Sequence, residues 1–230
     1  MAFRPSQSLF VPRTTEHATG SLPQRIYRQQ ESLTFRSALS PSGLLLFVAL
    51  LARPHWVMYY FGYGSNMLLS RLRRRVPSAE PVMNATLPNH GLRFHKRSRD
   101  GSGKCNIIAD DAETVHGVVF EVASEDLAPL DEAEQQGRRY RRRTVTVHGP
   151  RTSVETFTYV ADPFYVDDAL HPYEWYHALV LAGARQHELP DSYVADIEAV
   201  PTIPDPNRER RRSHQLLLED AGYPLPEYDA

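Results

Sequence analysis

Short apolar and alternating stretches follow one another between residues 59 and 160 of the chain. The aromatic run at residues 59–63 is typical of a buried strand. Further strands are predicted at residues 82–87, 92–96, 106–109, 115–122, 140–148 and 154–160. Turn residues such as Asp110 and Asp111 separate neighbouring stretches. The pattern therefore predicts one small sheet or barrel.

Apolar residues at helical spacing occur between and after these strands. One helix follows the aromatic strand at once and stops at Pro77, and a short one begins with Ser124 as its N-cap and runs to Glu134. Later helices are predicted from Pro172 through Ala184, over residues 193–200 and over residues 208–221. Short strands with helices inserted and appended predict an α+β domain.

The first 57 residues differ in composition from the rest of the chain. They carry six arginines and two acidic residues, whereas the remaining residues carry more acidic than basic groups. Their apolar run at residues 44–52 is shorter than the roughly 20 residues of a membrane span, and it lies beyond the usual position of a secretory signal. We expect a flexible extension over residues 1–57, a catalytic domain over 58–205, and a C-terminal helix with a loose tail over 206–230. A translation start at Met58 is the alternative explanation of this break in composition.

Charge and cysteine content exclude several classes of function. The formal charge of −2 gives no global attraction to nucleic acid or to an anionic membrane. One cysteine, Cys105, excludes a disulfide framework and a thiolate metal cluster, and favours a reducing compartment such as the cytoplasm. The ten histidines do not show the spacing of a helical zinc site, so no metal is expected.

The segment at residues 60–66 ends a predicted strand in glycines and opens a helix. Glycines allow successive N–H groups to point the same way, and the first N–H groups of a helix lack partners. Such a turn suits a carboxylate or a phosphate, and it lacks the lysine of a nucleotide-binding loop. A tight turn that Ser65 or Asn66 merely caps explains the same residues.

Three carboxylates stand close together at the end of the predicted helix before residue 135. Asp131 and Glu134 are three residues apart and share a helix face, whereas Glu132 points away from it. A carboxylate turned into a pocket can act as a general base. A solvated helix end is the alternative interpretation. Tyr140 follows this turn and is expected to reach the same pocket.

Several motifs together resemble those of the gamma-glutamylcyclotransferase family, which includes avirulence-induced-gene-like proteins. The resemblance covers roughly residues 58–200, in family order. It rests on Tyr-Phe-Gly-Tyr-Gly-Ser-Asn-Met at 60–67, His-Gly-Val-Val-Phe at 116–120, Leu-Asp-Glu-Ala-Glu at 130–134, Tyr176, Gly183-Ala184 and Leu189-Pro190. The family fold that this implies is a small β-barrel flanked by helices.

The resemblance also implies a chemistry. A free γ-glutamyl group of an amino acid or amine closes to 5-oxoproline and releases the amine, as in glutathione metabolism, without metal or cofactor. The implied general acid/base is Glu134. The implied binding residues are Tyr60, Phe61, Gly62, Tyr63, Gly64, Ser65, Asn66 and Tyr176. The partner is a small-molecule γ-glutamyl substrate, with no nucleic acid or membrane, and the enzyme is a monomer or homodimer.

The chain departs from the family pattern directly after the implied base. Family members often have a glycine there, whereas this chain has Gln135 and Gln136 before Gly137. The loop residue Asn66 also differs from the glutathione-specific branch. The alternative functions are a γ-glutamyl-amine-specific cyclotransferase, a γ-glutamyl acyltransferase and a non-catalytic module that binds a small anion.

Overall fold

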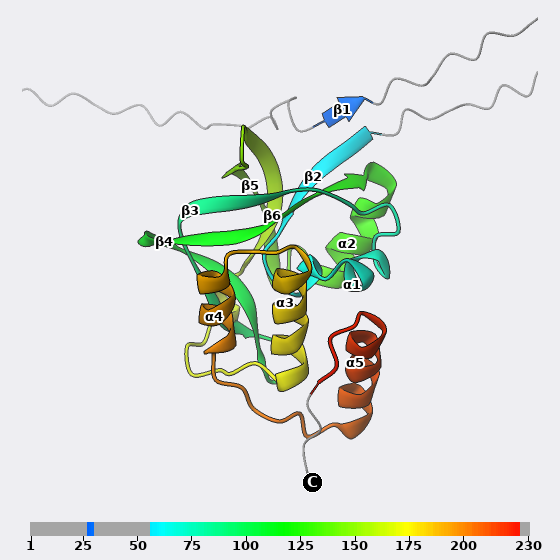
Figure 1. Ribbon diagram of the computed structural model, residues 1–230, viewed down its shortest axis with the longest axis vertical. Helices are drawn as coiled ribbons and strands as arrows, with labels where there is room; N and C mark the ends of the chain where they lie inside the picture. Colours follow the sequence, from blue (N-terminus) through cyan, green and yellow to red (C-terminus); the bar gives the residue numbers. More distant parts are fainter. Residues whose placement is uncertain (1–26, 30–55, 226–230) are drawn as a thin grey trace, which may run out of the picture.

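The computed structural model describes residues 27–29 and 56–225. In this part of the chain five strands close into a barrel (Figure 1). Their order is β2 (Trp56–Gly62), β4 (Gly103–Ala123), β3 (Glu80–Arg97), β5 (Tyr140–His148) and β6 (Ser153–Ala161). All neighbours are antiparallel except β2 and β6, whose parallel pairing of Tyr60 with Phe157 closes the ring. The predicted α+β barrel flanked by helices is confirmed.

Strands β3 and β4 are each longer than the sequence pattern predicts. Each joins two stretches that were expected to be separate strands, so the prediction of a turn at Asp110 and Asp111 is wrong. The pairing of β3 with β4 shifts register between Pro88 and His90, and Asn89 adopts a positive φ of 57°. A bulge absorbs these turn-type residues without ending the strand.

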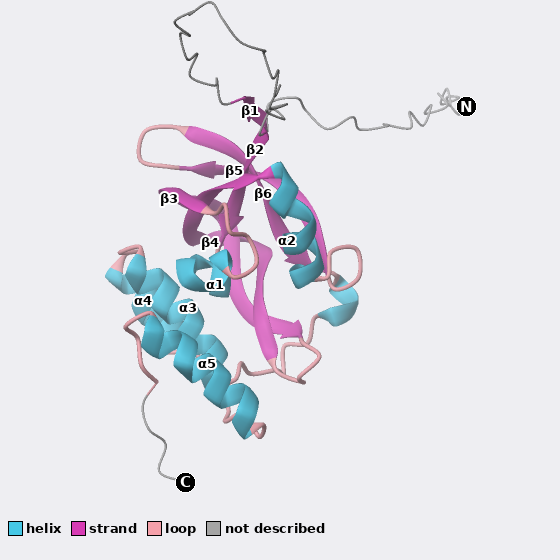
Figure 2. Cartoon of the chain, turned by 90° about the vertical axis from the view of Figure 1, so that its right-hand side faces the viewer, coloured by secondary structure: helices cyan, strands magenta, loops and turns pink. Residues whose placement is uncertain are grey.

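Helices cover the barrel on two sides. Figure 2 shows α3 (Glu174–Gln186), α4 (Asp191–Glu198) and α5 (Arg208–Asp220) beside one another, with α2 (Leu127–Glu134) on another side of the barrel. A Cβ on Gly183 would lie 2.6 Å from the backbone nitrogen of Leu68 and from Cβ of Met67. Glycine therefore lets α3 approach the segment that follows β2, which fixes that segment against the helix. Within the described residues, no helix combines the length and the apolar character that crossing a bilayer requires.

Several helix starts and ends differ from the predictions, including those of α4 (Asp191–Glu198), which was predicted over residues 193–200. The helix expected after the aromatic strand is a 3-10 turn, η2 (Ser65–Met67), followed by the five-residue α1 (Leu69–Arg73), because Leu68 between them is extended. Ser124 does not cap α2, since it lies in the 3-10 turn η3 (Ser124–Asp126) that precedes the helix. Helix α3 begins at Glu174 rather than near Pro172.

The N-terminal segment contributes one described strand. β1 (Tyr27–Gln29) pairs antiparallel with residues Trp56 to Met58 of β2, although the sequence predicts a flexible extension over residues 1–57. β2 itself begins two residues before the predicted boundary at Met58. The rest of that predicted extension, with the apolar run at 44–52, and residues 226–230 lie outside the described residues. The proposed division into domains stays a prediction.

Candidate active site

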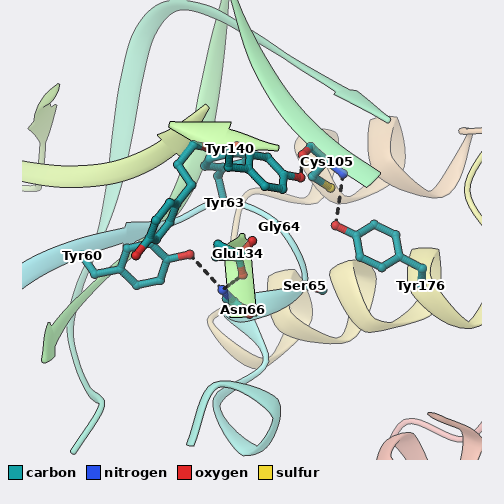
Figure 3. A pocket seen from close by; sticks show the side chains of 10 residues that line it. Tyr60, Tyr63, Gly64, Ser65, Asn66, Cys105, Glu134, Tyr140 and Tyr176 are labelled. Atoms are coloured by element: carbon teal, nitrogen blue, oxygen red, sulfur yellow. Dashed lines mark hydrogen bonds between the residues drawn. The ribbon is translucent and has the colours of Figure 1, made fainter. Parts of the chain in front are cut away.

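A cavity of about 30 Å³ lies at the C-terminal end of β2 (Figure 3). Its wall comes from β2 and the turn after it, from β4, β5 and β6, from the end of α2 and from α3. The lining residues are Tyr60, Tyr63, Gly64, Ser65, Asn66, Cys105, Glu134, Tyr140, Tyr159 and Tyr176. Six of the eight predicted binding residues, Glu134 and Tyr140 are therefore brought together.

Glu134 lies in the cavity wall with its carboxylate held from two sides. Its Oε1 accepts hydrogen bonds from Asn66 Nδ2 at 2.9 Å and from a terminal guanidinium nitrogen of Arg75 at 3.1 Å. The same nitrogen of Arg75 donates to Asn66 Oδ1 at 3.2 Å, and Asn66 Nδ2 also donates to the Tyr60 hydroxyl at 3.0 Å. The Glu134 side chain is 16% exposed. The carboxylate is thus oriented and partly shielded, yet it borders the cavity.

Neither Asp131 nor Glu132 lines the cavity, and the helical spacing predicted this only for Glu132. Asp131 accepts a hydrogen bond from the Tyr159 hydroxyl at 2.6 Å and pairs with Arg142 at 3.4 Å. Glu132 is exposed to solvent. Among the lining residues that the structure describes, Glu134 alone carries a carboxylate.

The end of α2 explains how Glu134 is positioned without the expected glycine. The N–H of Gln135 donates to the carbonyl of Glu132 at 3.0 Å, and the N–H of Gln136 donates to the carbonyl of Asp131 at 2.8 Å. These two bonds form a Schellman motif, whose first residue past the cap is left-handed. Gln135 takes that place, with φ 53° and ψ 46°. The turn has the backbone conformation that favours glycine, and the departure from the family pattern does not remove it.

Two predicted binding residues do not line the cavity. Phe61 is fully buried, and its ring packs over Gly117 inside the barrel. A Cβ on Gly62 would lie 3.1 Å from the Phe120 ring, so this glycine serves packing of the core. Alternation along β2 sends successive side chains to opposite faces, which separates Phe61 from Tyr60.

Close packing accounts for the glycine at position 64. Gly64 has φ −120° rather than a left-handed conformation. A Cβ there would lie 2.9 Å from Cβ of Cys105, so close approach of the loop to β4 requires glycine. The N–H groups of Gly64 and Ser65 stand at the start of η2, where no preceding helical carbonyl accepts them. The side chain of Ser65 accepts a hydrogen bond from Arg71 Nε at 3.1 Å.

Three tyrosine hydroxyls form hydrogen bonds to backbone groups in the wall of the cavity. The Tyr140 hydroxyl donates to the carbonyl of Cys105 at 2.6 Å, and the N–H of Cys105 donates to the Tyr176 hydroxyl at 3.1 Å. The Tyr63 hydroxyl donates to the carbonyl of Tyr159. These bonds fix the tyrosines around the backbone of β4 and β6.

Burial sets the protonation of the groups around the cavity. It raises the pKa of Tyr60 above the usual range, with the nearby Glu134 charge adding to the effect. Burial likewise raises the pKa of Tyr140 and of Tyr176. It raises the pKa of the Cys105 thiol to about 12, which favours the predicted structural thiol over a nucleophile. The lining hydroxyls and the thiol therefore keep their protons at neutral pH.

The sequence pattern missed Arg75 and Tyr159. Arg75 is one of several arginines in the segment after the aromatic strand, and nothing in the pattern singles it out. Its contact with Glu134 joins residues 59 positions apart. Tyr159 belongs to a predicted strand, but only barrel closure places it at the cavity. Within the described residues, no group of three or more His, Cys, Asp or Glu side chains could hold a metal ion.

A family model and a curated protein match the part of the chain that carries the site. The model of the AIG2-like family matches residues 114–197, a range that includes Glu134. Human gamma-glutamylcyclotransferase is 26% identical to this chain over 155 residues, which cover 61% of this chain and 77% of the human protein. The resemblance to the gamma-glutamylcyclotransferase family is confirmed.

Solved structures show that the fold is shared with gamma-glutamylcyclotransferases. A structure described as gamma-glutamyl cyclotransferase superposes with a TM-score of 0.63 at 24% identity, and covers 70% of this chain and 99% of that one. An uncharacterized protein from Homo sapiens superposes with a TM-score of 0.62 at 24% identity, and covers 69% of this chain and 98% of that one. At these identities the likeness establishes the barrel and its flanking helices.

Proposed function

We propose that this protein is a cofactor-free gamma-glutamylcyclotransferase that converts a γ-glutamyl compound to 5-oxoproline and a free amine. The observation that carries the proposal is the carboxylate of Glu134, held in the cavity wall by Asn66 and Arg75. The match to the AIG2-like family and the likeness to human gamma-glutamylcyclotransferase support the reaction class.

The reaction is an intramolecular acyl transfer. The α-amine of the γ-glutamyl group attacks its own γ-carbonyl carbon, a C–N bond forms in the ring, and the C–N bond to the leaving amine breaks. The α-ammonium loses two protons on its way to the lactam nitrogen, and the leaving nitrogen gains two. Glu134 takes each proton from the first nitrogen and delivers it to the second, so its charge is restored after the turnover.

The remaining residues hold the substrate in the bent conformer that cyclises. Ring closure has a large intramolecular advantage, so positioning and proton transfer are the main tasks of the protein. The N–H groups of Gly64 and Ser65 are the proposed site for the glutamyl carboxylate. Asn66 and Arg75 keep Glu134 oriented toward the amine.

We further propose that the enzyme works in the cytoplasm, because a single cysteine suits a reducing compartment. We also propose that it is a monomer or a homodimer.

A substrate panel tests the proposal. The protein is incubated with several γ-glutamyl amino acids, a γ-glutamyl amine, the γ-glutamyl-lysine isopeptide and glutathione, without added metal or cofactor, and 5-oxoproline is measured. We expect release from at least one donor. Transfer of the γ-glutamyl group to an added amino acid would identify an acyltransferase instead. Binding of 5-oxoproline without turnover of any donor would identify a non-catalytic module.

A further inference from the structure

Four arginines lie in α1 and directly after it, and one of them has no carboxylate partner among the described residues. The other three form ion pairs, Arg73 with Glu80, Arg74 with Asp220 and Arg75 with Glu134. Arg71 is half-buried, and within the described residues it makes a hydrogen bond only through Nε, which donates to the Ser65 hydroxyl at 3.1 Å. A charge that is shielded from water without an ion pair is costly, so this side chain calls for an explanation.

The hydroxyl that Arg71 holds belongs to the loop of the candidate site. Ser65 lines the cavity and is 7% exposed. Burial raises the pKa of Tyr176, and a side-chain hydrogen bond from Ser65 opposes this rise. The Ser65 hydroxyl therefore accepts from Arg71 and donates to Tyr176. This leaves the N–H groups of the loop, rather than the hydroxyl, to bind a ligand.

The charges around Arg71 are mainly positive. Burial lowers the pKa of the Arg71 guanidinium to about 10, and the Arg75 charge adds to this effect, so the group is still protonated at neutral pH. The carboxylate of Glu134 attracts it, but Glu134 is already held by Asn66 and Arg75. An anion bound at the loop would supply the negative charge that this part of the fold lacks.

We infer that Arg71 is a positioning residue for the glutamyl carboxylate and acts on it through Ser65. This inference rests on the proposed function, which assigns that carboxylate to the N–H groups of Gly64 and Ser65. The hydrogen bond from Arg71 fixes the Ser65 side chain against α1, and the guanidinium charge attracts a carboxylate bound on the other side of Ser65. Binding of substrate or product then balances a charge that the fold leaves unpaired.

The test compares two ligands that differ in one group. Calorimetry measures the binding of 5-oxoproline and of its neutral carboxamide, 5-oxoprolinamide, to the parent and to Arg71→Gln. Glutamine can still donate to Ser65 but carries no charge. The variant should bind 5-oxoproline about 10-fold more weakly or worse, as expected when a nearby unit charge is removed from a partly desolvated site, and should bind the carboxamide as the parent does. Unchanged binding of 5-oxoproline, or an equal loss for both ligands, overturns the inference.

Two further variants separate this role from a general effect of charge or of loop structure. Arg74→Gln removes a more exposed charge of the same segment, and it should bind 5-oxoproline as the parent does. Arg71→Lys keeps the charge and should bind 5-oxoproline more tightly than Arg71→Gln. Thermal denaturation without ligand checks that each variant is folded. Equal weakening by Arg74→Gln and Arg71→Gln, or no recovery in Arg71→Lys, contradicts the inference.

Turnover provides a second readout. With a γ-glutamyl donor, Arg71→Gln should raise KM by about the same factor and change kcat little, because Arg71 holds the carboxylate site rather than Glu134. A fall in kcat with unchanged KM overturns the inference. If the parent releases no 5-oxoproline from any donor, the proposed function fails, and the calorimetric comparison still tests Arg71. A parent that does not bind 5-oxoproline overturns the inference as well.

Discussion

Replacing Gln135 by glycine should stabilise the protein. Gln135 has φ 53° at the end of α2, where a non-glycine residue costs about 1–2 kcal/mol. Glycine loses more conformational entropy on folding, by about 0.5–1 kcal/mol. The difference leaves a net gain of about 0.5–1 kcal/mol in the free energy of unfolding. For a domain of this size it raises Tm by about 1–4 °C.

The matched control is the next glutamine. Gln136 has no positive φ, so Gln136→Gly gains nothing from the backbone and should lower Tm. Thermal denaturation and urea unfolding of the parent and both variants provide the measurement. A lower Tm for Gln135→Gly, or equal shifts for the two variants, would refute the explanation of how this turn carries Glu134 without a glycine.

Three further predictions concern the loop, a buried lysine and the N-terminal segment. Gly64→Val should lower the free energy of unfolding, measured in urea, by about 1–3 kcal/mol and should weaken 5-oxoproline binding, because a Cβ at this position lies 2.9 Å from Cβ of Cys105. Unchanged binding of 5-oxoproline would show that the loop is not part of the site. Burial lowers the pKa of Lys96 from 10.5 to about 8, so the folded state releases this proton at lower pH than the unfolded state. Between pH 8 and 10.5 the free energy of unfolding of the parent should therefore rise by up to about 3 kcal/mol relative to that of Lys96→Met. Parallel pH profiles of stability for the two proteins would contradict this. Deletion of residues 1–55 removes β1 but leaves β2 whole, so the thermal transition should stay cooperative with Tm a few degrees lower; aggregation of the truncated protein would show that the segment is part of the fold.

Local patterns in the sequence were sufficient for much of the fold. The strand at residues 140–148 was predicted with its observed bounds, and the helix over residues 208–221 to within one residue. The strand has a clear alternating period, and the helix has a clear capping residue. The side chain of Asn207 accepts a hydrogen bond from the N–H of Arg210 at 2.8 Å. Turn-type residues misled the prediction only where a bulge absorbed them in β3 and β4.

The candidate site could be predicted only where its residues belong to one continuous motif. The motif at 60–67 and the spacing of Asp131 and Glu134 were sufficient to propose the loop and the carboxylate. The contact of Arg75 with Glu134 and the position of Lys96 beside Tyr140 depend on how distant segments meet. Both follow from barrel closure and from the register of a bulged strand, which no local pattern specifies.

The role of Glu134 is tested most directly by the turnover of two single variants. Glu134→Gln can still accept a hydrogen bond from Asn66, but it cannot take a proton, whereas Glu132→Gln changes an exposed side chain two residues away. With thermal denaturation to show that both variants fold, 5-oxoproline release from a γ-glutamyl donor is measured. The account predicts a fall in kcat of about 10²- to 10⁴-fold for Glu134→Gln and a value near that of the parent for Glu132→Gln. Turnover by Glu134→Gln equal to that of the parent would contradict it.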